Sequence, residues 1–157
     1  MDEVLNAILK DTYTYTHLKH RLRVLKSYLI SKLFTSTPPP LETSDDDWLN
    51  SLQPNFYQQF NKDNVYQIFS DLEAKIAQSP KLLVYIPFTA PYQTVAQIGQ
   101  FIRSLFGKDL LFDTKFNPDL IAGCAISWHG VYRDYSLRAK IDQRKGEILE
   151  SFKKFLR

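Results

Sequence analysis

The chain has 157 residues, 44% of them hydrophobic and 14% aromatic, which excludes a disordered protein and suits one ordinary domain or a small domain with a helical extension. Its 20 basic and 17 acidic residues give a net charge of +3, so we expect a surface of mixed charge and not a uniformly cationic one. The only cysteine, Cys124, excludes an internal disulfide and fits a reducing compartment.

Residues 1–34 are predicted to form one long amphipathic helix. Strand-like propensity between Thr12 and Thr16 is outweighed by the helical periodicity on both sides. The apolar residues recur at spacings of three, four or seven and share one face: Val4, Ile8, Tyr15, Leu18, Leu22, Leu25 and Leu29. The opposite face is basic, with Lys19, His20, Arg21, Arg23 and Lys26. Along the apolar face, the candidates for partner binding are Leu18, Leu22, Leu25 and Leu29.

Residues 35–47 are predicted to be a linker, because Pro38 to Pro40 favour extended backbone and Asp45 to Asp47 repel one another. Short helices are predicted over residues 48–79. The first is capped by Asp47 and stopped by Pro54, and a clearer one begins at Asp63 or Asn64 and ends before Pro80. Its apolar face contains Val65, Ile68, Phe69, Leu72 and Ile76.

Residues 80–157 are predicted to form a small C-terminal α/β domain. Leu82 to Phe88 is an apolar run of strand length that we expect to be covered on both faces. A helix follows with Pro91 in its first turn and Gly107 after its last. Residues 109–116 alternate in polarity, which predicts a strand with one better-covered face.

The end of the chain is predicted to be a β-hairpin that leads into a final helix. His129-Gly130 is a two-residue turn signal, and Ser136 or Asp134 is placed to cap a helix running to Leu156. The apolar stripe of that helix contains Ile141, Ile148, Phe152 and Phe155. The predicted fold class is therefore α+β, with N-terminal helices followed by a strand-helix-strand-strand-helix domain that has a mixed sheet.

Two short motifs flank the hairpin. The first is Asn117-Pro118-Asp119-Leu120-Ile121-Ala122-Gly123, and the second is Asp134-Tyr135-Ser136-Leu137-Arg138 followed by Ile141. They resemble the turn Asp-Pro-x-Leu-Ile-Gly-Gly and the helix start Asp-Gly-Ser-Val/Leu-Arg-x-x-Leu in the C-terminal part of F-type ATP synthase delta subunits, called the oligomycin-sensitivity-conferring protein in mitochondria. Ala122 and Tyr135 stand where that family has glycine, and the resemblance reaches upstream to about Leu82.

The resemblance implies a non-catalytic peripheral-stalk subunit, or stator, with no cofactor and no small-molecule substrate. In that family a helical N-terminal domain sits on the catalytic head, so the implied partners are synthase alpha subunits and b-type stalk subunits. The implied location is cytoplasmic, peripheral to the inner (plasma) membrane as part of the complex. No signal peptide is expected, and no run of about 18 apolar residues predicts a membrane span, so membrane association would come through partners.

The family's N-terminal domain is a bundle of six helices, and six helices of about 11 residues with their connections need about 90 residues. The first predicted strand already begins at Leu82, so room remains for roughly three helices. Two alternatives follow. The chain is a reduced delta subunit whose first helix takes over the head contact, or it is a relative that kept only the stalk-binding half.

No catalytic or metal-binding motif is present, which predicts that the chain is not an enzyme. Phosphate loops, dinucleotide fingerprints, Cys-x-x-Cys and His-Glu-x-x-His are all absent from the sequence. His17 and His20 share a helix face but have no acidic or cysteine companion at metal-binding spacing, so we interpret them as solvated side chains. Cys124 is interpreted as a packed thiol, and His129 as the tip of the hairpin.

A nucleic-acid-binding or regulatory module is the alternative function. It would use the basic face of Lys19 to Lys26 together with a second cationic cluster on the last helix. That cluster, which solvent, phosphates or acidic partner helices would contact, consists of Arg138, Lys140, Arg144 and Lys145. Periodicity assigns most aromatic residues to the core, whereas single-strand binding needs exposed rings, so nucleic acid is the less favoured partner.

Overall fold

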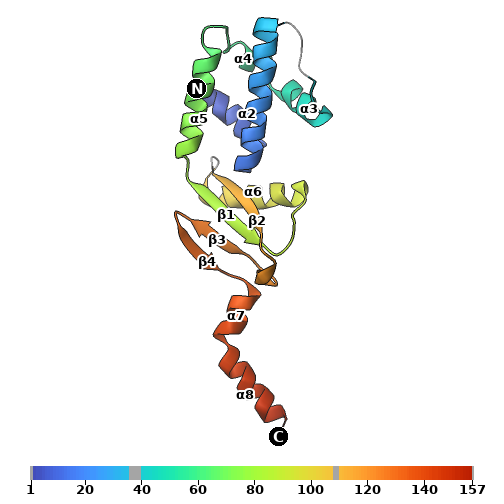
Figure 1. Ribbon diagram of the computed structural model, residues 1–157, viewed down its shortest axis with the longest axis vertical. Coiled ribbons are helices and arrows are strands. Elements are labelled where there is room, and N and C mark those ends of the chain that lie inside the picture. The colour runs from blue at the N-terminus through green and yellow to red at the C-terminus, as the bar shows by residue number, and fades with distance from the viewer. Residues whose placement is uncertain (1, 36–39, 108–109, 157) are drawn as a thin grey trace. The chain divides into compact units, whose positions relative to one another are not determined.

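The chain divides into two compact units, Met1–Ser79 and Pro80–Arg157, in a computed structural model that describes residues 2–35, 40–107 and 110–156 (Figure 1). Unit 1 is helical, and unit 2 contains a mixed β-sheet with helices. The predicted α+β class with N-terminal helices is confirmed, and the boundary between the units falls where the C-terminal domain was predicted to begin.

Unit 1 is built from short helices. In its described residues the helices are α1 (Asp2–Leu9), α2 (Tyr15–Ile30), a π-helical turn (Ser31–Thr35), α3 (Thr43–Ser51), α4 (Pro54–Tyr57) and α5 (Val65–Gln78). Five α-helices therefore fit where the sequence predicted room for roughly three, because most of them are shorter than the average helix of about 11 residues.

The prediction of one continuous helix over residues 1–34 is wrong, because the chain breaks between α1 and α2. Thr14 caps α2, its hydroxyl accepting a hydrogen bond from the backbone N–H of His17 at 3.1 Å. The buried Thr12 hydroxyl donates to the Ile8 carbonyl at 2.5 Å and accepts from Arg21 Nη1 at 2.6 Å. The threonines thus satisfy backbone groups by side-chain hydrogen bonds, which competes with helix continuation.

The acidic run after the prolines starts a helix and does not extend the linker. Residues 36–39, which include Pro38 and Pro39 of the predicted linker, lie outside the described residues. Helix α3 begins at Thr43 with Glu42 as its N-cap residue, and Asp45 and Asp46 lie in its first turn. Carboxylates are favourable at a helix N-terminus, which explains why the helix starts four residues before the predicted cap at Asp47.

The leucines predicted to bind a partner are instead the core of unit 1. Leu18 and Leu25 are 0% exposed, Leu22 is 5% exposed and Leu29 is 2% exposed. Helix α2 contacts α1, α3 and α5, and the apolar residues Phe69 and Leu72 of α5 are also fully buried. The prediction of a partner-binding face is therefore wrong, because the neighbouring helices already cover this stripe.

Unit 2 contains a four-stranded sheet in the order β2-β1-β3-β4. Its strands are β1 (Lys81–Ile86), β2 (Leu111–Phe116), β3 (Ala125–Trp128) and β4 (Val131–Asp134). Strand β1 pairs in parallel with β2 and antiparallel with β3, and β3 pairs antiparallel with β4. The sheet is mixed, as predicted. It has four strands, one more than the predicted strand-helix-strand-strand-helix order contains, because β2 and both strands of the hairpin join β1.

Helix α6 (Tyr92–Phe106) supplies the crossover that the parallel pair β1–β2 needs. Pro91 precedes the helix as its N-cap residue, and Gly107 ends it with φ of +110°. Burial changes along β2 and not between its faces, since Leu111 and Phe112 are both buried while Lys115 and Phe116 are exposed. The prediction that one face of this strand is better covered is therefore wrong.

The predicted final helix is divided in two, α7 (Leu137–Gln143) and α8 (Lys145–Phe155). Arg144 leaves the helical region with φ of −104° and ψ of 11°. Gly146 lies two residues further on and weakens helix propensity there. Neither helix has a buried residue.

Replacing Leu25 with alanine is expected to lower the free energy of unfolding of unit 1 by about 2–5 kcal/mol, because the truncation leaves a cavity in its core. Urea unfolding followed by circular dichroism measures the loss. The matched control is Ser27→Ala, an exposed position on the same helix, which should change stability by less than about 0.5 kcal/mol. Equal, small effects of the two substitutions would contradict the assignment of Leu25 to the core.

Candidate interaction site

The two motifs that flank the hairpin meet at one junction in unit 2. A 3-10 turn (Pro118–Leu120) follows β2, and α7 follows β4. Helix α7 contacts this turn directly, so segments 17 or more residues apart in sequence lie side by side. We call this region the β2–α7 junction and define it as residues 117–124 with residues 134–138.

The first motif forms two consecutive tight turns. The backbone N–H of Asn117 bonds the Ile86 carbonyl at 2.8 Å, and its side-chain oxygen accepts from the N–H of Asp119 at 3.2 Å. Leu120 is buried beneath the turn. The N–H of Ala122 then bonds the Leu120 carbonyl at 2.7 Å, which closes a γ-turn around Ile121.

Ile121 has φ of +63° and ψ of −60°, a conformation that is rare for a β-branched residue. Such a backbone costs about 1–3 kcal/mol and persists only where the surrounding structure fixes it. The side chain of Ile121 is exposed, so core packing does not provide this restraint. The restraint comes from the backbone hydrogen bonds on either side of Ile121.

Gly123 is the point of closest approach between the two motifs. Its φ is +87°, and a Cβ added there would lie 2.9 Å from the Tyr135 carbonyl oxygen and 3.1 Å from Ser136 Cα. Two backbone hydrogen bonds flank the contact. The N–H of Tyr135 bonds the Cys124 carbonyl at 2.9 Å, and the N–H of Leu137 bonds the Ala122 carbonyl at 2.8 Å.

The second motif starts α7. Ser136 is fully buried, and its hydroxyl accepts from the N–H of Ala139 at 3.2 Å, so it is the N-cap that the sequence predicted as one of two alternatives. Asp134, the other alternative, accepts from the N–H of Ser136 at 2.8 Å. Hydrogen bonds from the Ser136 hydroxyl and N–H, with the nearby Arg138 guanidinium, hold the pKa of Asp134 below its usual value.

Arg138 links the two motifs through its side chain. Its Nη1 donates to the Asp119 carbonyl at 3.5 Å, and its Nε lies 3.9 Å from the Asp142 carboxylate one turn along the helix. These groups are exposed, so each contact contributes little to stability. Together with the Gly123 approach, they bring residues 117–123 and 134–138 of the two motifs into one compact junction, which the sequence spacing alone could not establish.

The two positions at which this chain departs from the family's glycines do not need glycine. Among the described residues, positive φ at non-glycine positions occurs only at Ile121 and His129, so Ala122 and Tyr135 both have ordinary backbone conformations. The side chain of Tyr135 is half exposed. Gly123, the one glycine within the two motifs, is the one that the junction requires sterically.

Comparisons with known proteins add no family. No protein-family model matches the chain, and no curated protein matches its sequence. Among the helices that the structure describes, none has both the length and the apolar character to cross a membrane.

The histidines considered as a metal pair have a structural environment instead. His20 Nε2 lies 3.0 Å from both carboxylate oxygens of Asp45, which joins α2 to α3. The interpretation of His20 as a solvated side chain is therefore wrong, because its ring is paired with Asp45. Burial, followed by the charges of Arg21 and His20, lowers the pKa of His17. Within residues 2–35, 40–107 and 110–156, no cluster of three or more His, Cys, Asp or Glu side chains is placed to hold a metal ion.

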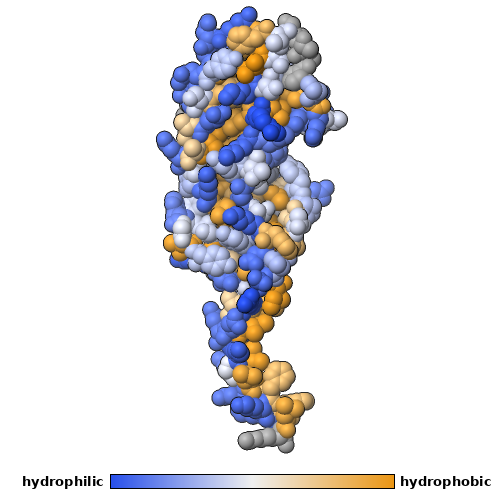
Figure 2. Space-filling model, in the orientation of Figure 1, coloured by the Kyte–Doolittle hydropathy of each residue, from blue (hydrophilic) through white to orange (hydrophobic). Residues whose placement is uncertain are grey.

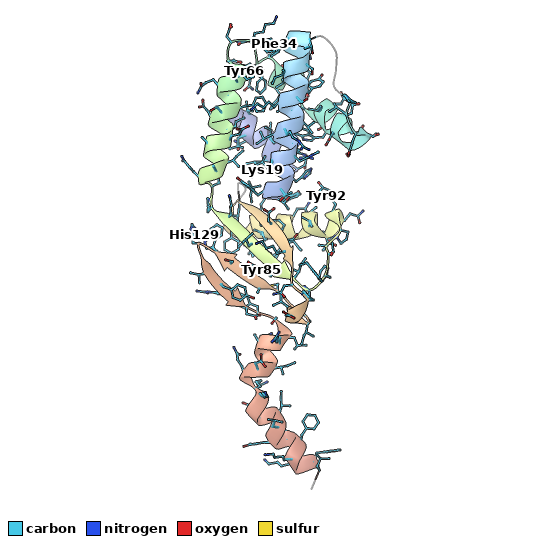
Figure 3. The ribbon with its side chains drawn as sticks, viewed as in Figure 1. Lys19, Phe34, Tyr66, Tyr85, Tyr92 and His129 are labelled. Carbon is cyan, nitrogen blue, oxygen red and sulfur yellow. The ribbon has the colours of Figure 1, made fainter. Side chains whose placement is uncertain are left out.

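An aromatic group lies on one face of the unit 2 sheet. The ring centroids of Tyr85, which is labelled in Figure 3, and Tyr132 are 5.6 Å apart. Lys115 Nζ lies 6.0 Å from the Tyr85 ring centroid. The strand register also places Asp113 and Asp134 on this face. The apolar periodicity of the sequence assigns most aromatic residues to the core, so it does not predict this pair of tyrosines. A strand face that is only partly covered shows the same alternation of apolar and polar residues as one that is fully covered.

Replacing Gly123 with alanine is expected to lower the free energy of unfolding of unit 2 by about 1–3 kcal/mol more than the matched substitution Gly130→Ala. Both glycines have positive φ, +87° and +79°, but a Cβ at Gly130 would meet no atom within 4 Å. The difference between the two variants therefore isolates the close approach to Tyr135 and Ser136. Thermal unfolding measures it, and equal losses would show that the approach is not a constraint.

Proposed function

We propose that the chain is a delta-type stator subunit of a rotary F-type ATP synthase, without catalytic activity of its own. The observation that carries the proposal is the β2–α7 junction. The residues that resemble the delta-subunit motifs lie together there, and the retained Gly123 occupies the position at which a side chain would collide with Tyr135 and Ser136. A chance match of two short motifs would not require their residues to meet.

A stator holds the catalytic head still against the torque of the rotor. This task requires two separate attachments on one chain, and the chain has two compact units to supply them. In the proposal, unit 1 contacts the alpha subunits of the head and unit 2 receives the b-type stalk helices. The protein would then lie on the cytoplasmic side, peripheral to the inner (plasma) membrane through its partners.

The surface by which unit 1 would contact the head differs from the predicted leucine face, which is buried. Phe34 and Tyr66 are both about half exposed, and their ring centroids are 6.1 Å apart (Figure 3). Lys62 Nζ lies 5.7 Å from the Phe34 ring centroid. Exposed aromatic residues beside a cation are favoured in protein interfaces, so this pair is the better candidate.

A single-stranded nucleic-acid-binding module is the second candidate, favoured by the exposed ring of Tyr132 beside the partly buried ring of Tyr85 on a sheet face. Such modules combine stacking rings with a positive groove. Here Asp113 and Asp134 share the face with Lys115, so the charges offset one another. This balance makes the stator the better supported function.

The proposal predicts that the tagged full-length chain, expressed in its own cells, co-purifies with the synthase alpha and b subunits after mild detergent extraction. Quantitative mass spectrometry should find them enriched over an untagged control strain. Binding to single-stranded DNA is expected to be weak. Tight binding that falls about 10³-fold or more between 50 and 200 mM salt, without recovery of synthase subunits, would favour the second candidate.

A further inference from the structure

Helices α7 and α8 carry an apolar surface that nothing in unit 2 covers. Large apolar residues that are more than one third exposed occur along both helices and at the residue that follows α8: Leu137, Ile141, Ile148, Leu149, Phe152, Phe155 and Leu156. Exposure rises from 37% at Ile148 to 89% at Phe155. In Figure 2 the hydrophobic residues of this segment gather mainly along one side.

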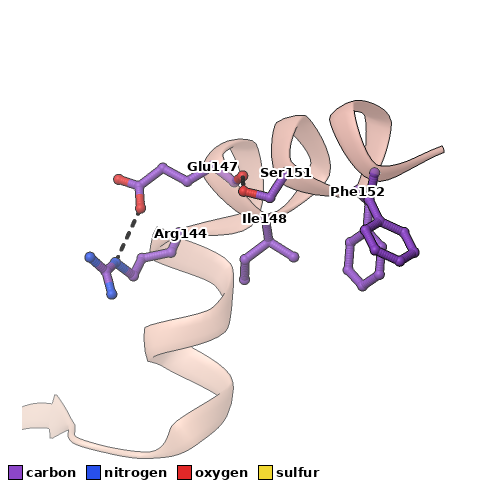
Figure 4. Close-up of a pocket in the computed structure, with 6 residues that line it drawn as sticks. Arg144, Glu147, Ile148, Ser151 and Phe152 are labelled. Atoms are coloured by element: carbon purple, nitrogen blue, oxygen red, sulfur yellow. Dashed lines mark hydrogen bonds and ion pairs between the residues drawn. The ribbon is translucent and has the colours of Figure 1, made fainter. Parts of the chain in front are cut away.

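The apolar residues of α8 are arranged for contact with another helix. Ile148, Phe152 and Phe155 are spaced by four and three residues, so they share one helix face. They line an open groove along α8 with Ser151 and an ion pair, Arg144 Nε to Glu147 Oε2 at 3.3 Å (Figure 4). An apolar row with a charged border is the form that a partner helix recognises through anchors at i, i+4 and i+7.

A helix of this length is marginal without a partner. Helix α8 has 11 residues, and isolated helices shorter than about 12–15 residues are only marginally stable in water. Most helix stability in proteins comes from burial of an apolar face, yet α8 buries none. Binding of a partner would therefore order and stabilise α8 as it covers Phe152 and Phe155.

The charge of the segment determines which partner fits. Residues 137–156 contain six basic and three acidic side chains, a net charge of +3. A second copy of the chain would bring two such segments together, so like charges oppose self-pairing. An anionic membrane would attract the segment, but membrane-surface helices have a polar face rich in Lys and Arg, and here Asp142, Glu147 and Glu150 interrupt it.

We infer that the exposed apolar face of α7 and α8, the C-terminal stripe, docks an amphipathic partner helix whose apolar face is bordered by acidic residues. This inference rests on the proposed function and identifies the surface of unit 2 that receives the stalk. The partner helix is then the soluble end of a b-type stalk subunit.

The test measures binding of the full-length chain to the soluble C-terminal segment of the b-type subunit from the same organism, by fluorescence anisotropy. The stripe variant Phe152→Ser with Phe155→Ser is expected to weaken binding at least about tenfold, because buried aromatic anchors dominate helix interfaces. The matched control is Phe101→Ser with Leu105→Ser, two exposed apolar residues of α6, which should bind as the wild-type chain does.

Charge reversal tests the acidic border separately. The variant Lys153→Glu with Lys154→Glu is expected to weaken binding about tenfold at low salt and less at high salt, since it opposes an acidic partner. The control Lys10→Glu with Lys75→Glu makes the same change in net charge at two exposed lysines of unit 1 and should have little effect. Tighter binding by the Lys153/Lys154 variant would overturn the acidic-partner assignment.

The outcomes separate this inference from the proposed function. If the wild-type chain and the stripe variant bind the stalk segment equally, the stripe is not the docking surface, while the stator proposal stands. If the wild-type chain does not bind the segment at all, both fail. Binding to vesicles with 30% phosphatidylserine in place of the stalk segment, lost in the stripe variant, would instead assign the stripe to a membrane surface. A dimer in analytical ultracentrifugation that the stripe variant abolishes would assign it to a second copy.

Discussion

The close approach of Gly123 to the backbone of Tyr135 and Ser136 is the constraint on which unit 2 depends. Backbone hydrogen bonds on either side, Leu137 N–H to Ala122 and Tyr135 N–H to Cys124, lock the chain before β3 to the chain after β4. The hairpin is thereby closed at its open end, and α7 must begin where Ser136 can cap it. The unusual φ of Ile121 follows from the same restraint, because the chain has to turn sharply to bring Gly123 into place.

The two units use their apolar residues differently. In unit 1 the leucine stripe of α2 is buried against the neighbouring helices. The large side chains that remain exposed include Phe34 and Tyr66. In unit 2 the apolar rows of α7 and α8 are exposed to solvent, and monomeric proteins rarely expose apolar surface of this extent. In the proposed stator these uncovered helix faces would hold other proteins, and an attachment of this kind needs no reactive group.

Sequence reasoning predicted the local signals of the fold well. His129-Gly130 forms the expected hairpin turn with positive φ at both residues, Gly107 ends α6, and Ser136 caps α7. It failed where the outcome depends on tertiary contacts. Periodicity continued across the break at Thr12 to Thr14, and the buried Arg21 that bonds Thr12 has no pattern that distinguishes it from a basic surface residue. A helical stripe that faces a core has the same spacing as one that faces a partner, so Leu18 to Leu29 and Ile148 to Phe155 became distinguishable only through their burial.

The central claim is mechanical coupling, and proton pumping tests it most directly. Inverted membrane vesicles from cells depleted of this chain should still hydrolyse ATP, because the catalytic head would turn without a fixed stator. ATP-driven acidification of the vesicles should be lost and should return when the purified chain is added back. Acidification that is unchanged by depletion, with the chain verified to be absent, would contradict the account.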